Sequence, residues 1–363
     1  MAGAAGLCNA RPRCYSGAMP SRRSMIGGLG GLMAGLMMPA PLAARAPTRP
    51  PRLRPGDVVG LIEPASFSDD LLQLEGVKAV VAGMGLVPRL GRHVATRYGY
   101  LAGTDEQRAA DINAMFGDSA VRAIFAVNGG WGSARLLPHL DWDRIRANPK
   151  LLIGFSDVTA LHLAFAARAG FPTLHAPNAA NGWYETSWDS FWRLAFAGEA
   201  PLFQPPETLG PDVEGEDGSP RVATIRPGTA RGLLIGGNLS VLATLVGTPW
   251  LPDFEGAILF LEDVNEAEYR IDRMLNQLAL AGVLGKVAGV IFGQCTRCAS
   301  RLPGYIGFTV PQLLDQYIRP LGVPAFRGAN IGHIADQLCL PVGAEVEMDA
   351  GRGSIRVLEP ITA

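Results

Sequence analysis

The amino-acid sequence predicts an α/β fold, in which helices cover a largely parallel β-sheet. Continuous apolar runs of strand length, such as residues 58–62 and the run that starts at Val121, alternate with stretches whose apolar residues recur at helical spacing. The chain has 363 residues and is 48% hydrophobic, which suffices for two domains. In such folds the site lies at the carboxyl ends of the strands, so residues at those ends are the candidates for chemistry.

The first half can be followed element by element. Gly56 and Asp57 form a turn before the first strand, and Thr104 with Gln107 fits a capping box at the start of a helix. The pattern predicts, in order, a strand over 58–62, a helix over 71–84, a strand near 85–90, a helix from Thr104 to about Gly117, a strand from Val121 and a strand over 151–154.

The composition changes after Asn178. Three tryptophans fall within residues 183–192, and the segment that follows them is rich in proline, glycine and acidic residues. Apolar runs resume at Arg231. We therefore predict an N-terminal domain over 47–178, a linker or lid over 179–230 and a C-terminal domain over 231–363.

The first 46 residues differ from the rest in charge. They hold five of the 32 lysines and arginines and none of the 33 acidic residues, which leaves 27 basic and 33 acidic side chains, a net charge of -6, for the remainder. A mildly acidic body without a basic run gives no support for nucleic-acid binding.

The same segment predicts export. An arginine pair at 22–23 precedes a glycine-rich apolar stretch over 25–40, and residues 44–46 (ARA) fit a small-x-small cleavage site. We expect 1–46 to be a twin-arginine signal peptide for a periplasmic protein; a floppy tail or an uncleaved anchor is the alternative, and without a working signal the protein would be cytoplasmic. The apolar run of about 16 residues falls short of the ~20 that span a bilayer, so no stable membrane insertion is expected. Translation could begin at Met1 or at Met19.

Three of the five cysteines, Cys295, Cys298 and Cys339, lie outside that segment. The Cys295-Thr-Arg-Cys298 spacing occurs in metal and redox sites, but neither a second pair nor a histidine cluster accompanies it, so no metal is predicted. Two structural thiols are the favoured interpretation, and a local disulfide in an oxidising compartment is the alternative.

Ser156 follows a predicted strand in the stretch LLIGFSDVTAL, where the chain turns into a helix. A serine at such a turn exposes its hydroxyl beside the first amides of the helix, and those amides can stabilise an oxyanion. The stretch lacks the second glycine of the G-x-S-x-G elbow, which argues against an α/β-hydrolase. A helix-capping serine is the commoner structure with this local sequence.

A serine nucleophile needs a base, and the chain has five histidines. His333, in the glycine-flanked loop GANIGHIADQLCLPVG, is the first candidate. His175 ends a predicted strand and is the second candidate; it could also line the substrate cleft. The base needs a carboxylate that orients it, and Glu262 stands at the end of the apolar strand over 257–261.

The stretch AVNGGWGSARLL places Gly129, Gly130 and Gly132 between a strand and an apolar helix. It has neither the G-x-G-x-x-G spacing nor the lysine of a phosphate-binding loop, so no nucleotide cofactor is predicted. A turn of this kind can present a backbone N–H that completes an oxyanion hole with the amide of Asp157.

Seven stretches resemble the serine LD-carboxypeptidases, which include the muramoyl-tetrapeptide carboxypeptidases and the microcin C immunity peptidases. They occur in family order from about Arg54 to Asp349: RPGDVVGLIEPAS, GYLAGTDEQRAADINAMF, NGGWGSARLLPHLD, IGFSDVTALH, GGNLSVLATLVGTPW, LEDVNEAEYRIDRMLNQL and IGH…LPVGAEVEMD. Asn128 and Trp131 stand where arginine and tyrosine are common in the family, and Ala176 where glycine is common.

The resemblance implies an N-terminal flavodoxin-like domain, a C-terminal β/α swivelling-type domain and a homodimer. It also implies a Ser-Glu-His triad and an oxyanion hole made by two backbone amides, with no metal. These residues are Ser156, Glu262 and His333 for the triad, and Gly130 and Asp157 for the amides. The implied reaction releases the terminal D-alanine of a peptidoglycan tetrapeptide by cutting the L,D bond after meso-diaminopimelate or lysine.

Two other functions stay open at this point. A microcin-like peptidase would cleave an aminoacyl-nucleotide peptide, and Trp183 and Trp188 could then stack on its nucleobase. A non-catalytic periplasmic protein that binds a small ligand would share the two-domain layout, but it would not need Ser156, Glu262 and His333 to converge.

Overall fold

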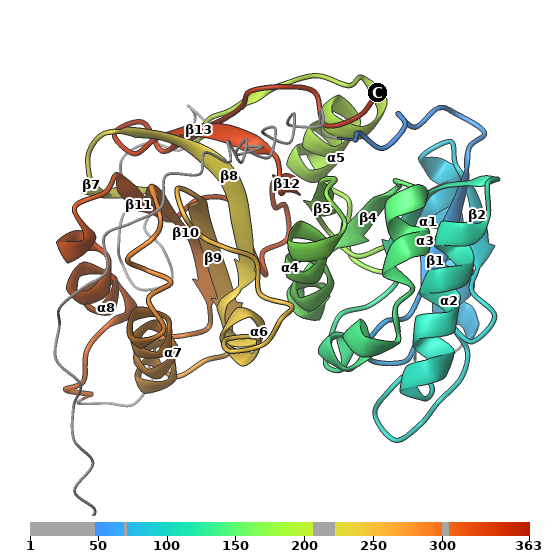
Figure 1. The fold of residues 1–363 in the computed structure, drawn as a ribbon, viewed down its shortest axis with the longest axis horizontal. Helices are drawn as coiled ribbons and strands as arrows, with labels where there is room; N and C mark the ends of the chain where they lie inside the picture. Colours follow the sequence, from blue (N-terminus) through green and yellow to red (C-terminus); the bar gives the residue numbers. More distant parts are fainter. Residues whose placement is uncertain (1–47, 69–70, 206–221, 300–304) are drawn as a thin grey trace, which may run out of the picture. The chain divides into compact units, whose positions relative to one another are not determined.

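The described residues of the unit that begins at Ala46 form two β-sheets with helices on their faces (Figure 1). The computed structural model describes residues 48–68, 71–205, 222–299 and 305–363. The predicted signal peptide lies outside the described residues. None of the helices in the described ranges combines the length and the apolar character that a membrane span requires.

The first sheet has six strands in the order β12-β5-β4-β3-β1-β2. Strands β1 to β5 are parallel, and β12 pairs antiparallel with β5. The order 2-1-3-4-5 is that of flavodoxin-like sheets, so the fold implied for the N-terminal domain is confirmed. The strands are β1 (Val58–Ile62), β2 (Val87–Leu90), β3 (Val121–Ala126), β4 (Leu151–Gly154), β5 (Thr173–His175) and β12 (Leu340–Val342).

The helices of this half begin and end close to the predicted bounds. The capping box at Thr104 is confirmed, because its side chain accepts from the N–H of Gln107 while the Gln107 side chain accepts from the N–H of Thr104. The helical elements are α1 (Leu71–Gly83), α2 (Asp105–Gly117), η1 (Ser133–His139), α3 (Trp142–Ala147), η2 (Ser156–Val158) and α4 (Thr159–Arg168).

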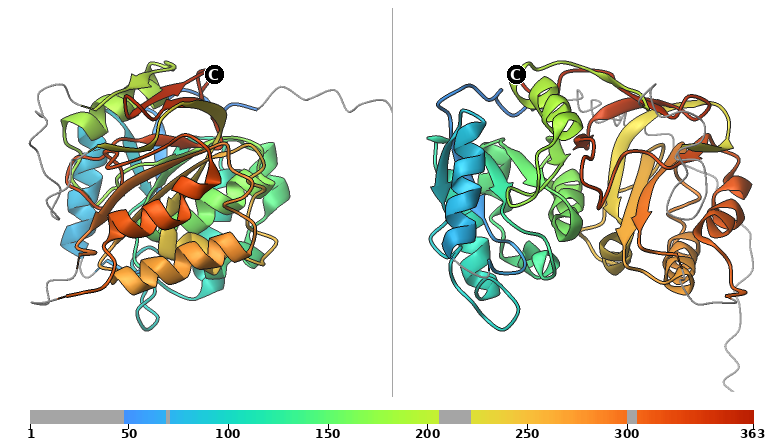
Figure 2. Two further views of the ribbon diagram at one scale, coloured as in Figure 1. Left: turned by 90° about the vertical axis from the view of Figure 1, so that its left-hand side faces the viewer. Right: turned by 180° about the vertical axis from the view of Figure 1, so that it is seen from behind.

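The second sheet has eight strands in the order β6-β14-β13-β8-β9-β10-β11-β7. Its four central strands, β8 to β11, are parallel, and the outer strands pair antiparallel. Figure 2 shows α7 and α8 side by side on one face of this sheet. The elements are β6 (Leu202–Phe203), β7 (Ala223–Arg226), β8 (Thr229–Asn238), α6 (Leu239–Thr244), β9 (Ile258–Val264), α7 (Glu268–Leu280), β10 (Gly289–Thr296), α8 (Val310–Tyr317), η4 (Arg319–Leu321), β11 (Ala325–Arg327), β13 (Glu345–Asp349) and β14 (Ser354–Val357).

The segment predicted as a linker or lid contains regular structure that its composition did not predict. It forms α5 (Glu185–Phe191), the π-helical turn η3 (Trp192–Phe196) and strands β6 and β7, and β8 begins at its end. Phe191 and Leu194 are fully buried, and Phe203 in β6 is nearly so. The proline-rich stretch over 206–221 lies outside the described residues.

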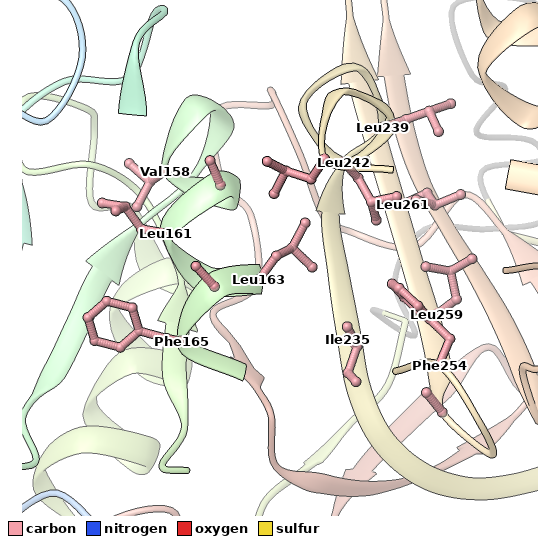
Figure 3. Packing of buried hydrophobic residues seen from close by; sticks show 14 of the residues in the cluster. Val158, Leu161, Leu163, Phe165, Ile235, Leu239, Leu242, Phe254, Leu259 and Leu261 are labelled. Carbon is pink, nitrogen blue, oxygen red and sulfur yellow. The ribbon is translucent and has the colours of Figure 1, made fainter. Parts of the chain in front are cut away.

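Helix α4 lies between the two sheets and is buried on both of its faces (Figure 1). In Figure 3, Leu163 points toward the second sheet, whereas Leu161 and Phe165 point away from it. A helix that is apolar all round is stable only when it is enclosed. The helix that follows Ser156 is therefore held by both halves of the chain.

Cys295 and Cys298 form a disulfide at the end of β10. The favoured interpretation of two thiols was wrong, and the alternative of a local disulfide is correct. The physical reason is a tight turn, in which Arg297 has a left-handed φ of 59° that brings the two side chains together. Cys339 is a free, buried thiol.

Candidate active site

Ser156 lies two residues beyond the carboxyl end of β4, as the first residue of η2. Its φ of 63° is left-handed, a conformation that costs a residue with a Cβ roughly 1–2 kcal/mol and occurs often at functional sites. The neighbouring backbone is held in place, because the N–H of Phe155 donates to Asn178 Oδ1 (3.0 Å). The strained turn raises the hydroxyl from the sheet edge, as in a nucleophile elbow.

The imidazole of His333 faces the Ser156 hydroxyl. Its Nε2 lies 2.9 Å from Ser156 Oγ. The ring packs on Phe155, with 4.7 Å between the ring centroids, and about a fifth of the side chain (19%) is exposed. The imidazole is therefore partly open to solvent, and its packing on Phe155 restricts its orientation.

Glu262 completes a hydrogen-bonded chain of three residues. Its Oε2 lies 2.7 Å from Nδ1 of His333, and the residue is completely buried. Within the described part of the chain its Oε1 has no hydrogen-bond partner, so the carboxylate is directed at His333 alone. β9 extends two residues past Glu262, to Val264, whereas the sequence placed this residue at the strand's end.

Gly332, directly before His333, allows the loop that carries His333 to lie close to the Glu262 side chain. Its φ is +113°, and a Cβ there would lie 2.8 Å from both Cβ and Oε2 of Glu262. We expect Gly332→Ala to displace the Glu262 carboxylate and to lower kcat by at least about tenfold, since small displacements of catalytic groups have large effects. The backbone strain adds a loss of roughly 1–3 kcal/mol in unfolding free energy.

Steady-state kinetics and chemical denaturation measure the two effects separately. Gly322→Ala is the matched control, because Gly322 also has a left-handed φ (+77°) but a Cβ added there would have no neighbour within 4 Å. The control should lose stability and keep kcat. Equal kcat values for the two variants would contradict the explanation.

The glycine-rich turn lies against the serine. A Cβ on Gly129 would lie 3.0 Å from Cβ and 3.3 Å from Oγ of Ser156. Gly130 has a φ of +110°, and a Cβ there would collide with Ser66 Oγ at 2.0 Å. Gly130 is therefore restricted to glycine, whereas a side chain at Gly129 would require the Ser156 side chain to shift by a few tenths of an ångström. The roles of the Gly130 and Asp157 amides as oxyanion donors stay predictions.

Two buried charged groups anchor the same turn. The Asp157 carboxylate accepts from the N–H of Ser133 (2.7 Å), and burial raises the pKa of Asp157. The guanidinium of Arg108 donates to the carbonyls of Gly132 (3.0 Å) and Pro64. Arg108 also pairs with Asp105, which offsets the burial of its charge.

The three residues predicted to contact substrate, His175, Trp183 and Trp188, are buried or half-buried. His175 is completely buried between Phe155 and Phe260, and this burial lowers the pKa of its imidazole well below the usual value. The structure therefore does not place His175 in an open cleft. Trp183 and Trp188 are half-buried and pack on Phe191.

Glu63 is a neighbour of this site that the sequence patterns did not single out. It follows β1, is almost fully buried, and its Oε1 accepts from Ser68 Oγ and from Asn128 Nδ2 (3.1 Å). Burial raises the pKa of Glu63 to about 7, although hydrogen bonds from Ser68 and from the side chain and backbone of Asn128 lower it. The one sequence signal that could have identified Glu63 was its position, as an acidic residue directly after a buried strand.

The raised pKa predicts how stability varies with pH. The folded state holds the Glu63 proton up to about pH 7, whereas an ordinary glutamate carboxyl has a pKa of 4.5, so the folded state binds more protons in between. Stability is then full below the unfolded pKa and is lost as pH rises through the folded pKa, by roughly 3 kcal/mol. We expect Glu63→Gln to lack this loss.

Urea unfolding of both proteins at pH 4.5 and pH 8 tests this. The stability of Glu63→Gln relative to wild type should rise by about 3 kcal/mol between the two pH values. Glu75→Gln, at an exposed site, is the control and should follow the wild type. An equal change in unfolding free energy between the two pH values for Glu63→Gln and wild type would contradict the raised pKa.

A serine, a histidine and a glutamate joined by two hydrogen bonds at the ends of parallel strands have the geometry of a serine hydrolase. Two family models match the chain: the LD-carboxypeptidase N-terminal domain over residues 59–176 and the LD-carboxypeptidase C-terminal domain over residues 231–348. The chain belongs to the LD-carboxypeptidase family. It is an enzyme of that family, and the alternative of a non-catalytic binding protein is set aside.

Three curated relatives illustrate the range of the family. The chain is 37% identical over 301 residues to a probable murein peptide carboxypeptidase of Bacillus subtilis (83% of this chain, 91% of the relative). It is 33% identical over 308 residues to a murein tetrapeptide carboxypeptidase of Pseudomonas aeruginosa (81% and 94%). It is 28% identical over 286 residues to the microcin C7 self-immunity protein MccF of Escherichia coli (72% and 80%).

Solved structures share the fold. The muramoyltetrapeptide carboxypeptidase of Oxalobacter formigenes superposes with a TM-score of 0.70 at 26% identity, covering 83% of this chain and 97% of that one. MccF in complex with glutamyl sulfamoyl guanosine superposes with a TM-score of 0.77 at 24% identity, covering 87% and 99%. The α/β architecture of two sheets is thus common to both branches.

Proposed function

We propose that this protein is a serine LD-carboxypeptidase that releases the terminal D-alanine of murein tetrapeptides. The observation that carries the proposal is the hydrogen-bonded chain from Ser156 through His333 to Glu262. Such a chain activates a hydroxyl for attack on a carbonyl. The bond cut would follow meso-diaminopimelate or lysine.

The geometry supports a two-stage reaction. His333 Nε2 takes the proton as Ser156 Oγ attacks the scissile carbonyl, and Nδ1–H donates to Glu262, which stabilises the imidazolium. The same proton then passes to the leaving amine of D-alanine, which leaves an acyl-enzyme on Ser156. Water attacks this ester with His333 again as the base, and the serine is regenerated. Backbone amides of Gly130 and Asp157 would hold the oxyanion.

The substrate assignment rests on the relatives. Those from Bacillus subtilis and Pseudomonas aeruginosa are named for murein peptides, and the chain covers more than nine-tenths of each. The same family also contains MccF, so the murein substrate needs a direct test.

The first experiment incubates the protein with L-Ala-γ-D-Glu-meso-DAP-D-Ala and follows it by mass spectrometry. We expect the loss of one alanine. The lysine-containing tetrapeptide, run in parallel, identifies the residue that precedes the bond. An intact peptide in the presence of protein that a fluorophosphonate labels at Ser156 would overturn the substrate and retain the nucleophile.

The second candidate function is that of a microcin-type peptidase. It is favoured by the similarity to MccF, which has been solved with glutamyl sulfamoyl guanosine. An aminoacyl sulfamoyl nucleoside is therefore the second substrate to offer. If Trp183 and Trp188 stack on the base, Trp183→Ala and Trp188→Ala should weaken its binding.

We also propose export to the periplasm by a twin-arginine signal, and a homodimer. Support for export comes from the arginine pair at 22–23 and the apolar stretch that follows it. Cell fractionation of the full-length protein and of its Arg22→Lys, Arg23→Lys variant tests the signal, and light scattering of residues 47–363 tests the dimer. The domain bounds 47–178, 179–230 and 231–363 stay predictions.

A further inference from the structure

A buried carboxyl, Glu63, lies next to the glycine-rich turn and has no part in the proposed reaction. We propose that Glu63 is a positioning residue, which acts through the Asn128 side chain to fix the Gly129–Gly130 turn against Ser156. The inference rests on the proposed function of Ser156 as the nucleophile.

The first support is the set of contacts made by the Glu63 carboxyl. Its Oε1 accepts from Asn128 Nδ2 (3.1 Å) and from Ser68 Oγ. Asn128 Nδ2 also donates to Ser68 Oγ (3.1 Å), so the three side chains form a closed ring of hydrogen bonds. A ring of this kind restricts every member to one rotamer, including Asn128, the residue directly before Gly129.

The second support is the position of the turn. Its Gly129 backbone comes so close to Ser156 that a Cβ would touch the serine side chain at 3.0 Å. Its far side is also bound, because the N–H of Ser66 donates to the carbonyl of Gly129 (3.2 Å). A small rotation at Asn128 would therefore move the Gly129 and Gly130 amides relative to the Ser156 hydroxyl.

The third support is the burial of the carboxyl itself. Glu63 is 2% exposed, and its Oε2 has no hydrogen-bond partner among the residues that the structure describes. Enclosing a half-satisfied carboxyl destabilises a fold, and burial raises the pKa of Glu63 to about 7. An apolar residue would avoid that loss but would remove one of the two acceptors of the Asn128 amide and leave only Ser68 Oγ. The presence of a buried carboxyl at this position is explained if Glu63 fixes the Asn128 side chain.

The test compares two substitutions of Glu63. Glu63→Gln keeps an acceptor oxygen of the same reach, and Glu63→Leu removes it at similar volume. We expect Glu63→Leu to lower kcat on the tetrapeptide by about 10- to 100-fold with KM within about threefold, because a displaced oxyanion turn weakens only the transition state. Glu63→Gln should restore kcat to within about threefold of wild type.

A second readout does not depend on the peptide. The rate of Ser156 labelling by a fluorophosphonate should fall by about tenfold or more in Glu63→Leu and not in Glu63→Gln. Equal labelling rates in wild type and Glu63→Leu would overturn the positioning role and leave the proposed function intact. A wild type that is neither labelled nor active would overturn the proposed function, and the positioning role with it.

A third variant, at Asn128, tests the same proposal if Glu63→Leu does not fold. Asn128→Ala should show the same loss of labelling, and the double variant should be no slower than the slower single variant, because both act through one contact. Additive losses would overturn the route through Asn128. Asp111→Ala is the matched control: Asp111 is also a buried carboxyl, but it accepts from the N–H of His93 (2.9 Å), away from the turn. It should lose stability and label normally.

Discussion

Ser156→Ala should abolish hydrolysis of the tetrapeptide, with kcat reduced by at least about 10⁴-fold. The reason is chemical: Ser156 Oγ is the atom that His333 Nε2 faces at 2.9 Å, and alanine has no nucleophile to replace it. Turnover measured by release of D-alanine checks this, and fluorophosphonate labelling should disappear with it. Ser119→Ala, at an exposed serine, is the control and should behave as wild type.

Backbone strain at Ser156 adds a finer test of the same variant. Since its φ is 63°, glycine should fit this turn better than alanine. We expect Ser156→Gly to be inactive yet more stable than Ser156→Ala by about 1 kcal/mol. Thermal unfolding of the two inactive proteins measures the difference. A less stable glycine variant would show that the left-handed turn is not strained.

Glu262→Gln should give the second largest loss, about 10³- to 10⁴-fold in kcat. Glutamine can donate its amide N–H to Nδ1 of His333, which would place the ring proton on Nε2 and leave no base for Ser156. The volume is unchanged and a buried charge is removed, so the fold should persist. Steady-state kinetics measure the loss of kcat, and a parallel urea titration measures any change in stability.

A matched control for this substitution is Glu347→Gln. Glu347 lies in β13 of the same sheet and pairs with Arg231 at a partly exposed site, and neither of the two contacts His333. The kcat of Glu347→Gln should stay within about twofold of wild type, because an exposed ion pair contributes little to stability. If Glu262→Gln kept full activity, the base would need no carboxylate and the triad would reduce to a dyad.

Local patterns predicted much of the fold. The strand over 58–62 and the helix that begins after Thr104 agree with the structure, because apolar periodicity and capping depend on near neighbours in sequence. The position of Ser156 after a buried strand was equally local. His333 and Glu262 were candidates from their positions in the sequence, the family resemblance implied the same pair, and the structure brings the two together.

Contacts between residues far apart in the sequence could not be predicted from local patterns. β12 crosses from the far end of the chain to pair with His175, and that pairing helps to enclose the histidine. α5 is joined to the loop of His333 because the amides of Thr186 and Ser187 donate to Asp336. Neither contact has a sequence signal, since the partners are about 150 or more residues apart.

The distance along the chain between Ser156 and its base has a consequence for synthesis. His333 follows Ser156 by 177 residues and Glu262 comes between them. A nascent chain that has completed the first five parallel strands carries Ser156 but not His333, the base that we propose. Under the proposed mechanism, hydrolytic activity therefore appears late, when nearly the whole polypeptide has left the ribosome and its last strands have joined both sheets. Recovery of turnover during refolding would consequently report the final docking event, and truncation anywhere before residue 333 would yield an inert product.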